Sequence, residues 1–265
     1  MNDLLSVKNL SVAYGEKTTV RNVSLRLAEG AIRCLVGTTG SGKSTVLHAV
    51  AGLLGAGARI TGGSIVFCGE ELSDATPSRM RELLGNRISL IFQNPENFFD
   101  PIMRIGDQFA EFLKYHDSSL QNAECADMTV KALAEMRLEE PERLLSLYPF
   151  ELSGGMLQRC AIALAMLSKP RLLLADEPTS ALDIVSQAKI LGELKRLNRE
   201  TGTAILLVTH SMKVATALDG LVSVMHDGEV VEEGFARDVL SQPKAAYTKE
   251  LIHSLPDIEE MRLVE

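Results

Sequence analysis

The sequence lacks an excess of positive charge, and this absence argues against a nucleic-acid partner. Its formal net charge is −8 at pH 7 and its pI lies near 5.3. Proteins that bind a phosphate backbone need a basic surface, which this composition does not favour. With 265 residues, of which 46% are apolar, the chain can bury a core of its own as one large domain or two smaller lobes.

Long apolar runs are also missing. The longest wholly apolar run extends only from Ala161 to Leu167, far short of the ~20 residues that span a bilayer. The N-terminus carries Asp3 and Lys8 and has no continuous apolar stretch, so we expect no secretory signal. If the protein works at a membrane, we expect another chain to hold it there.

Cysteines are few and lie far apart. The four are Cys34, Cys68, Cys125 and Cys160, and no Cys-x-x-Cys pair occurs among them. This spacing predicts buried thiols in a reducing cytoplasm rather than disulfides or a metal cluster.

A glycine-rich stretch carries a phosphate-binding pattern, G-x-x-x-x-G-K-[ST]. An apolar run, 32–36, precedes it and a helix-compatible segment, 44–51, follows it, which a chance glycine-serine turn would not explain. The backbone N–H groups and the helix N-terminus can surround a polyphosphate, Lys43 adds a positive charge, and the Ser44 hydroxyl can ligate Mg²⁺. The expected nucleotide-binding residues are Gly37, Thr38, Thr39, Gly40, Ser41, Gly42, Lys43, Ser44 and Thr45.

Two adjacent acids, Asp176 and Glu177, follow a second apolar strand. Ligands of open α/β sheets bind at such strand ends. Asp176 can hold the Mg²⁺ shell, and Glu177 can orient or deprotonate the water that attacks the γ-phosphate. The alternative, two acids that cap the next helix, is weakened by the upstream P-loop.

Strand and helix patterns alternate along the chain, which predicts a parallel sheet wrapped by helices. We expect short strands joined by tight turns over residues 4–36, and a helical insert over 104–146 with breaks at Pro141 and Pro149. The other expected elements are strands 64–68, 88–92, 171–175 and 204–208, a helix at 156–168, a helix from about 184 to Gly202, a hairpin at 222–231 turned at Asp227–Gly228, and a helical tail after 236.

A second anion cradle is expected at the start of the helix near residue 156. Ser153, Gly154 and Gly155 stand directly before it, although a plain helix cap is the alternative. The run Leu-Ser-Gly-Gly-Met-Leu-Gln-Arg, residues 152–159, resembles the signature motif of ATP-binding cassette (ABC) ATPases, which ordinary P-loop kinases and GTPases lack.

Other motifs resemble the same family in the same order. Tyr14 matches the aromatic residue that stacks on adenine, Gln93 the glutamine that senses Mg²⁺ and the attacking water, and His210 the histidine that contacts the γ-phosphate. Asp183, in Ser180-Ala181-Leu182-Asp183, matches the loop that crosses to a second subunit. On residues alone, Tyr14 could be a turn tyrosine and His210 a structural histidine.

The resemblance implies an α/β fold: a P-loop NTPase (RecA-like) core with an N-terminal antiparallel β lobe and an inserted helical signature subdomain. The implied ranges are 1–93 with 169–235 for the β lobe and core, 94–168 for the helical subdomain and 236–265 for a helical tail. ATP and Mg²⁺ are the implied cofactors. The implied catalytic residues are Glu177, His210, Gln93 and Lys43, and the implied metal ligands are Ser44, Gln93 and Asp176.

The resemblance also implies partners. Two cassettes pack head to tail, so we expect a second ATPase subunit, either identical or related, two transmembrane permease subunits, an extracytoplasmic substrate-binding protein and no nucleic acid. The expected location is the cytoplasmic face of the cell membrane. The segment 94–108, with Phe98 and Phe99 as exposed aromatics, is expected to help receive the permease; the alternative places both rings in a core.

Several stretches resemble the peptide/nickel group of cassette importers, including 92–95, 105–108 and Tyr247-Thr248. Residues 147–159 look most like the nickel and metallophore members, and no cysteine follows Cys160, so nickel or a metal chelate is the expected cargo. A dipeptide or oligopeptide is the alternative. A soluble cassette ATPase of DNA repair is disfavoured because sustained heptads are absent, and a ribosome-associated factor because only one set of motifs occurs.

Overall fold

The computed structural model describes residues 3–180 and 182–253. The chain divides into two compact units, one made of residues up to Thr76 together with those from Leu206 onward, and one made of Pro77–Ile205. The sequence-derived domain ranges stay a prediction. Ala181 of the expected loop and residues 254–265 of the expected tail lie outside the described residues.

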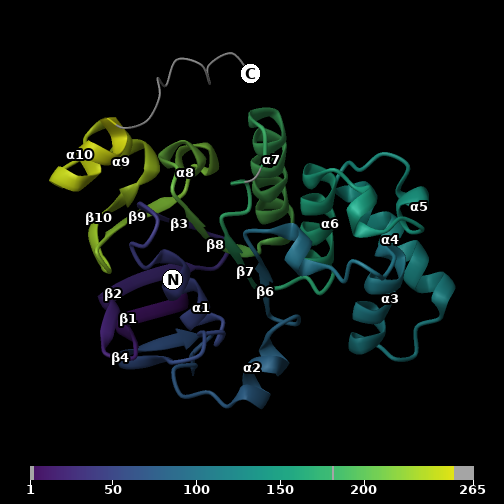
Figure 1. The fold of residues 1–265 in the computed structure, drawn as a ribbon, viewed down its shortest axis with the longest axis horizontal. Helices are drawn as coiled ribbons and strands as arrows, with labels where there is room; N and C mark the ends of the chain where they lie inside the picture. The colour runs from purple at the N-terminus through teal and green to yellow at the C-terminus, as the bar shows by residue number, and fades with distance from the viewer. Residues whose placement is uncertain (1–2, 181, 254–265) are drawn as a thin grey trace. The chain divides into compact units, whose positions relative to one another are not determined.

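The first unit contains two β-sheets (Figure 1). One has the order β2-β1-β4-β5, in which β1 pairs antiparallel with both β2 and β4. In the other, β10 pairs antiparallel with β9, β9 pairs parallel with β3, and β8 follows β3 in the order. The elements are β1 (Asp3–Tyr14), β2 (Lys17–Ala28), β3 (Ile32–Val36), α1 (Lys43–Val50), β4 (Ala58–Phe67), β5 (Glu70–Glu71), α8 (Met212–Leu218), β9 (Leu221–His226), β10 (Glu229–Phe235), α9 (Ala236–Ser241) and α10 (Ala246–His253).

The second unit is mainly helical and also holds two parallel strands, β6 and β7. Every residue of both strands is buried, as expected for parallel strands covered on two faces. The strand β8 (Ala204–Thr209) begins in this unit beside β7 and ends in the first. The elements are α2 (Pro77–Leu83), β6 (Ile88–Ile91), a 3₁₀ turn (Pro95–Phe98), α3 (Ile105–His116), α4 (Asn122–Glu135), α5 (Pro141–Leu144), a 3₁₀ turn (Pro149–Glu151), α6 (Gly154–Met166), β7 (Leu172–Asp176) and α7 (Ile184–Thr201).

The expected helical insert forms, with α3, α4 and α5 inside the range 104–146. In α3 the buried residues Ile105, Phe109 and Leu113 recur every four positions, and so form one face. Proline begins α5, where its missing N–H costs no helical hydrogen bond. The expected end of α7 is also confirmed, because Gly202 adopts a left-handed φ of 70° and caps the helix.

The lengths predicted for the N-terminal strands were wrong. Instead of short strands, β1 and β2 have 12 residues each, because irregular pairing near Asn9 lets the ladder continue past polar residues. The strand expected at 64–68 starts at Ala58, because Gly62 and Gly63 lie inside it rather than in a turn. At Gly63, with φ 89°, a Cβ would lie 2.4 Å from the Asn9 carbonyl oxygen, so this glycine permits the close approach of the two strands.

Two further predictions need correction. The short helix α2 was not expected, although Met80 and Leu83 bury its inner face. The aromatic pair expected to be exposed is not: Phe99 is 4% exposed and Phe98 half-buried, and their rings meet edge to face with centroids 5.4 Å apart. The alternative, a core position, therefore holds for Phe99.

Candidate functional site

The P-loop joins β3 to α1 in the first unit and has the conformation that its glycines predict. Gly40 and Gly42 have φ values of 85° and 98°, in the left-handed region where glycine is favoured. Lys43 is 4% exposed, and its Nζ donates to the Thr38 carbonyl oxygen at 2.7 Å, with the Ser41 hydroxyl oxygen 3.4 Å away. The loop thus curls around its own lysine, whose ammonium group lies inside the ring of backbone.

The turn between β9 and β10 supports this loop from behind. A Cβ on Gly37 would lie 2.2 Å from the Met225 carbonyl oxygen, so no larger residue fits there without a backbone shift. The Gly228 N–H donates to the Ser41 carbonyl oxygen at 3.1 Å. The predicted Asp227–Gly228 turn therefore contributes directly to the shape of the P-loop.

The residues present suit a polyphosphate with Mg²⁺. Lys43, Ser44 and Thr45 form the first turn of α1, where the positive end of the helix dipole favours an anion. The buried ammonium of Lys43 adds a positive charge, and the Ser44 hydroxyl is an oxygen ligand of the kind that Mg²⁺ accepts. The donor set of the loop therefore fits the nucleotide that the sequence predicts.

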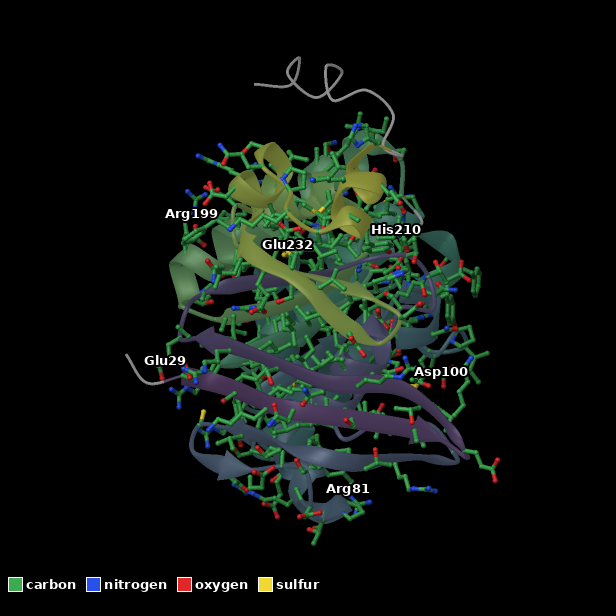
Figure 2. All side chains as sticks on the ribbon, turned by 90° about the vertical axis from the view of Figure 1, so that its left-hand side faces the viewer. Glu29, Arg81, Asp100, Arg199, His210 and Glu232 are labelled. Carbon is green, nitrogen blue, oxygen red and sulfur yellow. The ribbon has the colours of Figure 1, made fainter. Side chains whose placement is uncertain are left out.

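Tyr14 and His210 belong to the same unit as the P-loop. Tyr14 ends β1, and its side chain is 37% exposed, which leaves ring surface available for stacking. His210 directly follows Thr209, the last residue of β8, and is exposed; Figure 2 labels it. Because β8 neighbours β3 in the sheet order, His210 extends the strand next to the one that enters the P-loop.

The second unit brings Gln93, Asp176 and Glu177 together. Parallel pairing matches Ile91 of β6 with Ala175 of β7, so Gln93 and Glu177 each lie two residues beyond the last matched pair. Asp176 is 7% exposed, whereas Gln93 is exposed. Glu177 adopts a φ of 44°, an unusual conformation for a residue with a side chain and one often found at functional sites.

Within residues 3–180 and 182–253, no group of three or more His, Cys, Asp or Glu residues could hold a metal ion by itself. An Mg²⁺ ion that is bound to a nucleotide keeps few protein ligands and takes others from phosphate oxygens and water. Asp176 and Gln93 supply oxygen atoms of the right kind in this unit.

The signature stretch begins α6. Ser153 is the N-cap, and its hydroxyl oxygen accepts from the Met156 N–H at 3.3 Å, so the plain-cap interpretation describes the structure as it stands. Ser153 and Gly154 are exposed, and a Cβ on Gly155 would lie 3.3 Å from the Ser186 hydroxyl oxygen. Gly155 therefore permits the start of α6 to approach the start of α7 closely.

Asp183 caps α7 and is exposed. Its carboxylate accepts from the Ser186 hydroxyl at 2.6 Å and from the Ser186 N–H at 3.0 Å. These hydrogen bonds hold the pKa of Asp183 below its ordinary value, since they favour the charged form. The predicted loop residue is thus fixed as a carboxylate beside the signature turn.

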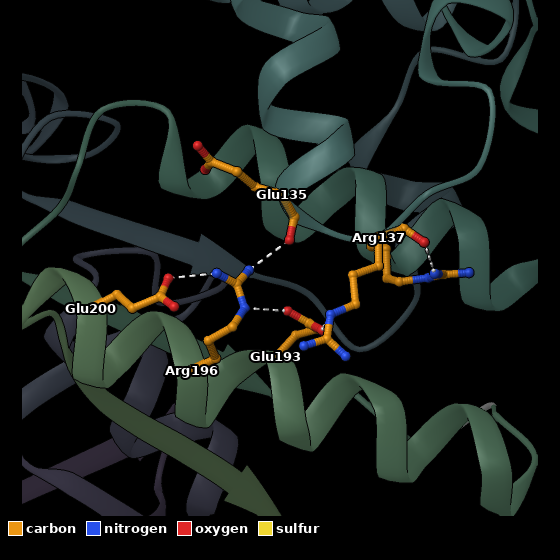
Figure 3. A network of polar contacts seen from close by, with 6 residues as sticks. Glu135, Arg137, Glu193, Arg196 and Glu200 are labelled. Carbon is orange, nitrogen blue, oxygen red and sulfur yellow. Dashed lines mark hydrogen bonds and ion pairs between the residues drawn. The ribbon is translucent and has the colours of Figure 1, made fainter.

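A polar network ties α6 and α7 to the end of α4, and nothing in the sequence pattern predicted it (Figure 3). The buried Glu193 of α7 pairs with Arg137 at 3.0 Å and with Arg196 at 2.8 Å. The Arg196 guanidinium also donates to the Glu135 carbonyl oxygen at 2.6 Å. Arg159 of α6 donates to the Arg137 carbonyl oxygen at 3.0 Å and to the Gly155 carbonyl oxygen at 3.3 Å. The first turn of the signature helix is therefore linked to a carboxylate on α7.

Three of the four cysteines are buried, as the spacing predicts, and Cys68 is not. Cys34, Cys125 and Cys160 are buried, Cys68 is half-buried, and all four are free. Burial raises the pKa of both Cys34 and Cys160 to about 12, although Arg33 and Arg159 oppose the shift. These thiols therefore stay protonated and unreactive.

No helix within the described ranges is both long enough and apolar enough to span a membrane.

Comparison with known proteins defines the family. The family described as ABC transporter matches residues 20–180. The oligopeptide transport ATP-binding protein OppD of Escherichia coli (strain K12) is 40% identical over 260 residues, which cover 97% of this chain and 77% of OppD. The dipeptide transport ATP-binding protein DppD of Haemophilus influenzae is 37% identical, over 97% of this chain and 79% of DppD.

A solved structure has a fold similar to that of this chain. The dimeric ATP-binding cassette MJ0796, in a post-hydrolysis state bound to ADP and Pi, matches with a TM-score of 0.77 and 30% identity, over 88% of this chain and 99% of that one. The expected α/β fold, with an antiparallel β lobe and a mixed core sheet, is confirmed. The chain belongs to the ABC transporter family and is an ATP-binding protein that hydrolyses ATP.

Proposed function

We propose that this chain powers an importer of small peptides by hydrolysing ATP, with the P-loop of the first unit as the element that binds the nucleotide. The observation that carries the proposal is the P-loop itself. Its left-handed glycines and buried Lys43 form a cradle for a polyphosphate, and its support from Met225 and Gly228 keeps that shape.

Each of the expected residues has a task that its chemistry suits. Lys43 would neutralise phosphate charge, and Ser44, Asp176 and Gln93 would supply oxygen ligands to Mg²⁺. Glu177 would position and deprotonate the attacking water. The metal, when bound, supplies charge stabilisation at the phosphate oxygens. His210 contacts the γ-phosphate, and the ring of Tyr14 stacks on adenine.

The signature turn serves a second cassette. An exposed Ser153 and Gly154 at a helix N-terminus present N–H groups to an anion that need not belong to the same chain. The similar cassette MJ0796 is dimeric, which supports a dimer here as well. Binding of ATP between the P-loop of one subunit and the signature turn of the other would favour the closed dimer, and hydrolysis would release it. Two permease subunits at the cytoplasmic face of the membrane and an extracytoplasmic binding protein complete the proposed complex.

The relatives favour peptides over nickel as cargo. OppD and DppD are named for oligopeptide and dipeptide transport and match almost the whole of this chain. The nickel prediction, which depended on residues 147–159 and the lack of a late cysteine, finds no such support. Uptake of a labelled dipeptide and of nickel in cells that lack this chain tests the choice. We expect peptide uptake to fall and nickel uptake to stay, and the reverse result would restore nickel.

The catalytic assignment is tested by Glu177→Gln, which removes the carboxylate and keeps the shape. We expect steady-state hydrolysis of ATP by the complete transporter to fall by a factor of about 100 or more, as for loss of a general base, while ATP binding persists. Glu151→Gln, at an exposed acid before α6, is the matched control and should hydrolyse normally. Normal turnover in Glu177→Gln would contradict the assignment.

A further inference from the structure

Tyr247 connects the last described helix to the P-loop, although the two are 209 positions apart. The Thr38 N–H donates to the Tyr247 hydroxyl oxygen at 3.0 Å. The Thr38 and Tyr247 hydroxyl oxygens are also 3.0 Å apart, so one donates to the other. The second residue of the P-loop is thus held through both its backbone and its side chain by a single hydroxyl group from α10.

The ring of Tyr247 is itself held in place. It stacks on His226, the last residue of β9, with centroids 3.9 Å apart and an interplanar angle of 24°. His226 also precedes the turn that contacts the loop from behind through Gly228 and Met225. The P-loop therefore receives fixed contacts from the β9–β10 hairpin and from α10, both within the first unit.

The start of α10 is anchored by the carboxylate of Glu232 on β10, which Figure 2 labels. It accepts from the backbone N–H groups of Lys244 and Ala245 at 2.9 and 3.0 Å. Because these two contacts fix the residues just before Tyr247, its hydroxyl reaches Thr38 with less freedom left to lose.

We propose that Tyr247 is a positioning residue for nucleotide binding: its hydroxyl holds Thr38, and with it the entrance of the P-loop, in the conformation that receives the phosphates. The inference rests on the proposed role of the P-loop as the nucleotide site. A loop that samples other conformations binds its ligand more weakly in proportion to the time it spends in them. Contacts that hold one conformation before the ligand arrives therefore raise affinity without touching the ligand.

The test is Tyr247→Phe, which removes the hydroxyl group and keeps the ring on His226. We expect the affinity of the full-length chain for ADP, measured by calorimetry, to fall about fivefold, the net value of one ordinary hydrogen bond. ADP avoids both turnover and closure of a dimer. Tyr115→Phe, which removes the hydroxyl of a tyrosine that is 74% exposed on α3, is the control and should leave the affinity unchanged.

Hydrogen exchange separates positioning from general stability. In Tyr247→Phe we expect faster amide exchange in residues 37–42 and unchanged exchange in β3, with the thermal midpoint within about 1 °C of the original, since an exposed contact contributes little to global unfolding. Unchanged ADP affinity, or a loss of affinity that accompanies faster exchange throughout the unit, would overturn the proposal.

Lys43→Ala separates a failure of the role proposed for Tyr247 from a failure of the P-loop assignment. If it abolishes ADP binding while Tyr247→Phe has no effect, only the role of Tyr247 fails; if Lys43→Ala binds ADP normally, the P-loop assignment itself fails.

Discussion

Replacement of Glu193 by glutamine should destabilise the second unit, because this carboxylate is the centre of the network that joins α4, α6 and α7 (Figure 3). Its side chain is only 7% exposed and pairs with two guanidinium groups, those of Arg137 and Arg196. Glutamine has nearly the same shape and keeps one acceptor oxygen. The substitution therefore removes the charge and leaves the packing.

The two ion pairs of Glu193 are not equal. Arg137 is 75% exposed, so solvent screens its pair with Glu193 and the contribution is at most about 1 kcal/mol. Arg196 is 22% exposed and also donates to the Glu135 carbonyl oxygen, so its position is fixed and its hydrogen bond to the carboxylate is worth about 1.5–3 kcal/mol. Glutamine can keep one of the two contacts in a weaker form through its single acceptor oxygen, but its NH2 group cannot accept from the other guanidinium, so we expect a net loss of about 2 kcal/mol in the free energy of unfolding.

Urea unfolding followed by far-UV circular dichroism measures this change. The control is Glu200→Gln, which also removes a carboxylate from Arg196, but an exposed one whose pair is worth about 0.3–0.5 kcal/mol. The two variants should thus differ several-fold. Equal losses in both variants, or a loss below about 0.5 kcal/mol in Glu193→Gln, would refute the view that burial makes this carboxylate the centre of the network.

Two further predictions concern the first unit. Gly37→Ala should abolish ADP binding measured by calorimetry and lower the free energy of unfolding by about 1–3 kcal/mol, because its Cβ would overlap the Met225 carbonyl oxygen. The control is Gly192→Ala, at an exposed position within α7 where a Cβ would have no neighbour within 4 Å. This variant should instead raise the free energy of unfolding by about 0.5–1 kcal/mol. Burial alone would raise the pKa of Glu232, but hydrogen bonds to its carboxylate outweigh burial and lower this pKa. The Glu232 carboxylate therefore contributes fully to stability above its ordinary pKa of about 4.3, and this contribution is lost as the pH falls through the lower pKa of the folded state. Glu232→Gln should therefore lower the urea midpoint at pH 7, and the difference from the original chain should shrink in acid; a difference independent of pH would contradict this account.

The sequence could predict those parts of the site that depend on neighbouring residues. The P-loop, the cap at Ser153 and the acids after β7 all follow from short patterns, because a turn or a helix start is decided by a few consecutive residues. The buried face of α3 was predictable for the same reason, since its period is that of the helix. Their roles in hydrolysis stay predictions.

What the sequence could not predict depends on partners far away in the chain. The strand was expected to start only after Gly62 and Gly63, but both glycines lie in β4 because this stretch pairs with β1, and a Cβ at Gly63 would lie 2.4 Å from the Asn9 carbonyl oxygen. Likewise, no periodic signal marks Glu193 as the partner of Arg137, because the pair connects α7 to the turn after α4, 56 positions earlier in the chain.

The P-loop itself combines both kinds of information. Its motif specifies which atoms can meet a phosphate, since the glycines, the lysine and the serine occur within Gly37–Ser44. Its shape, however, is held by residues outside the motif: the Met225 carbonyl group lies against Gly37, the Gly228 N–H binds Ser41, and Tyr247 binds Thr38. Substitutions in the β9–β10 turn or in α10 should therefore change nucleotide affinity while every motif residue stays the same. Chains with an identical P-loop can thus differ in how tightly they bind a nucleotide, and the cause lies in the C-terminal part of the sequence.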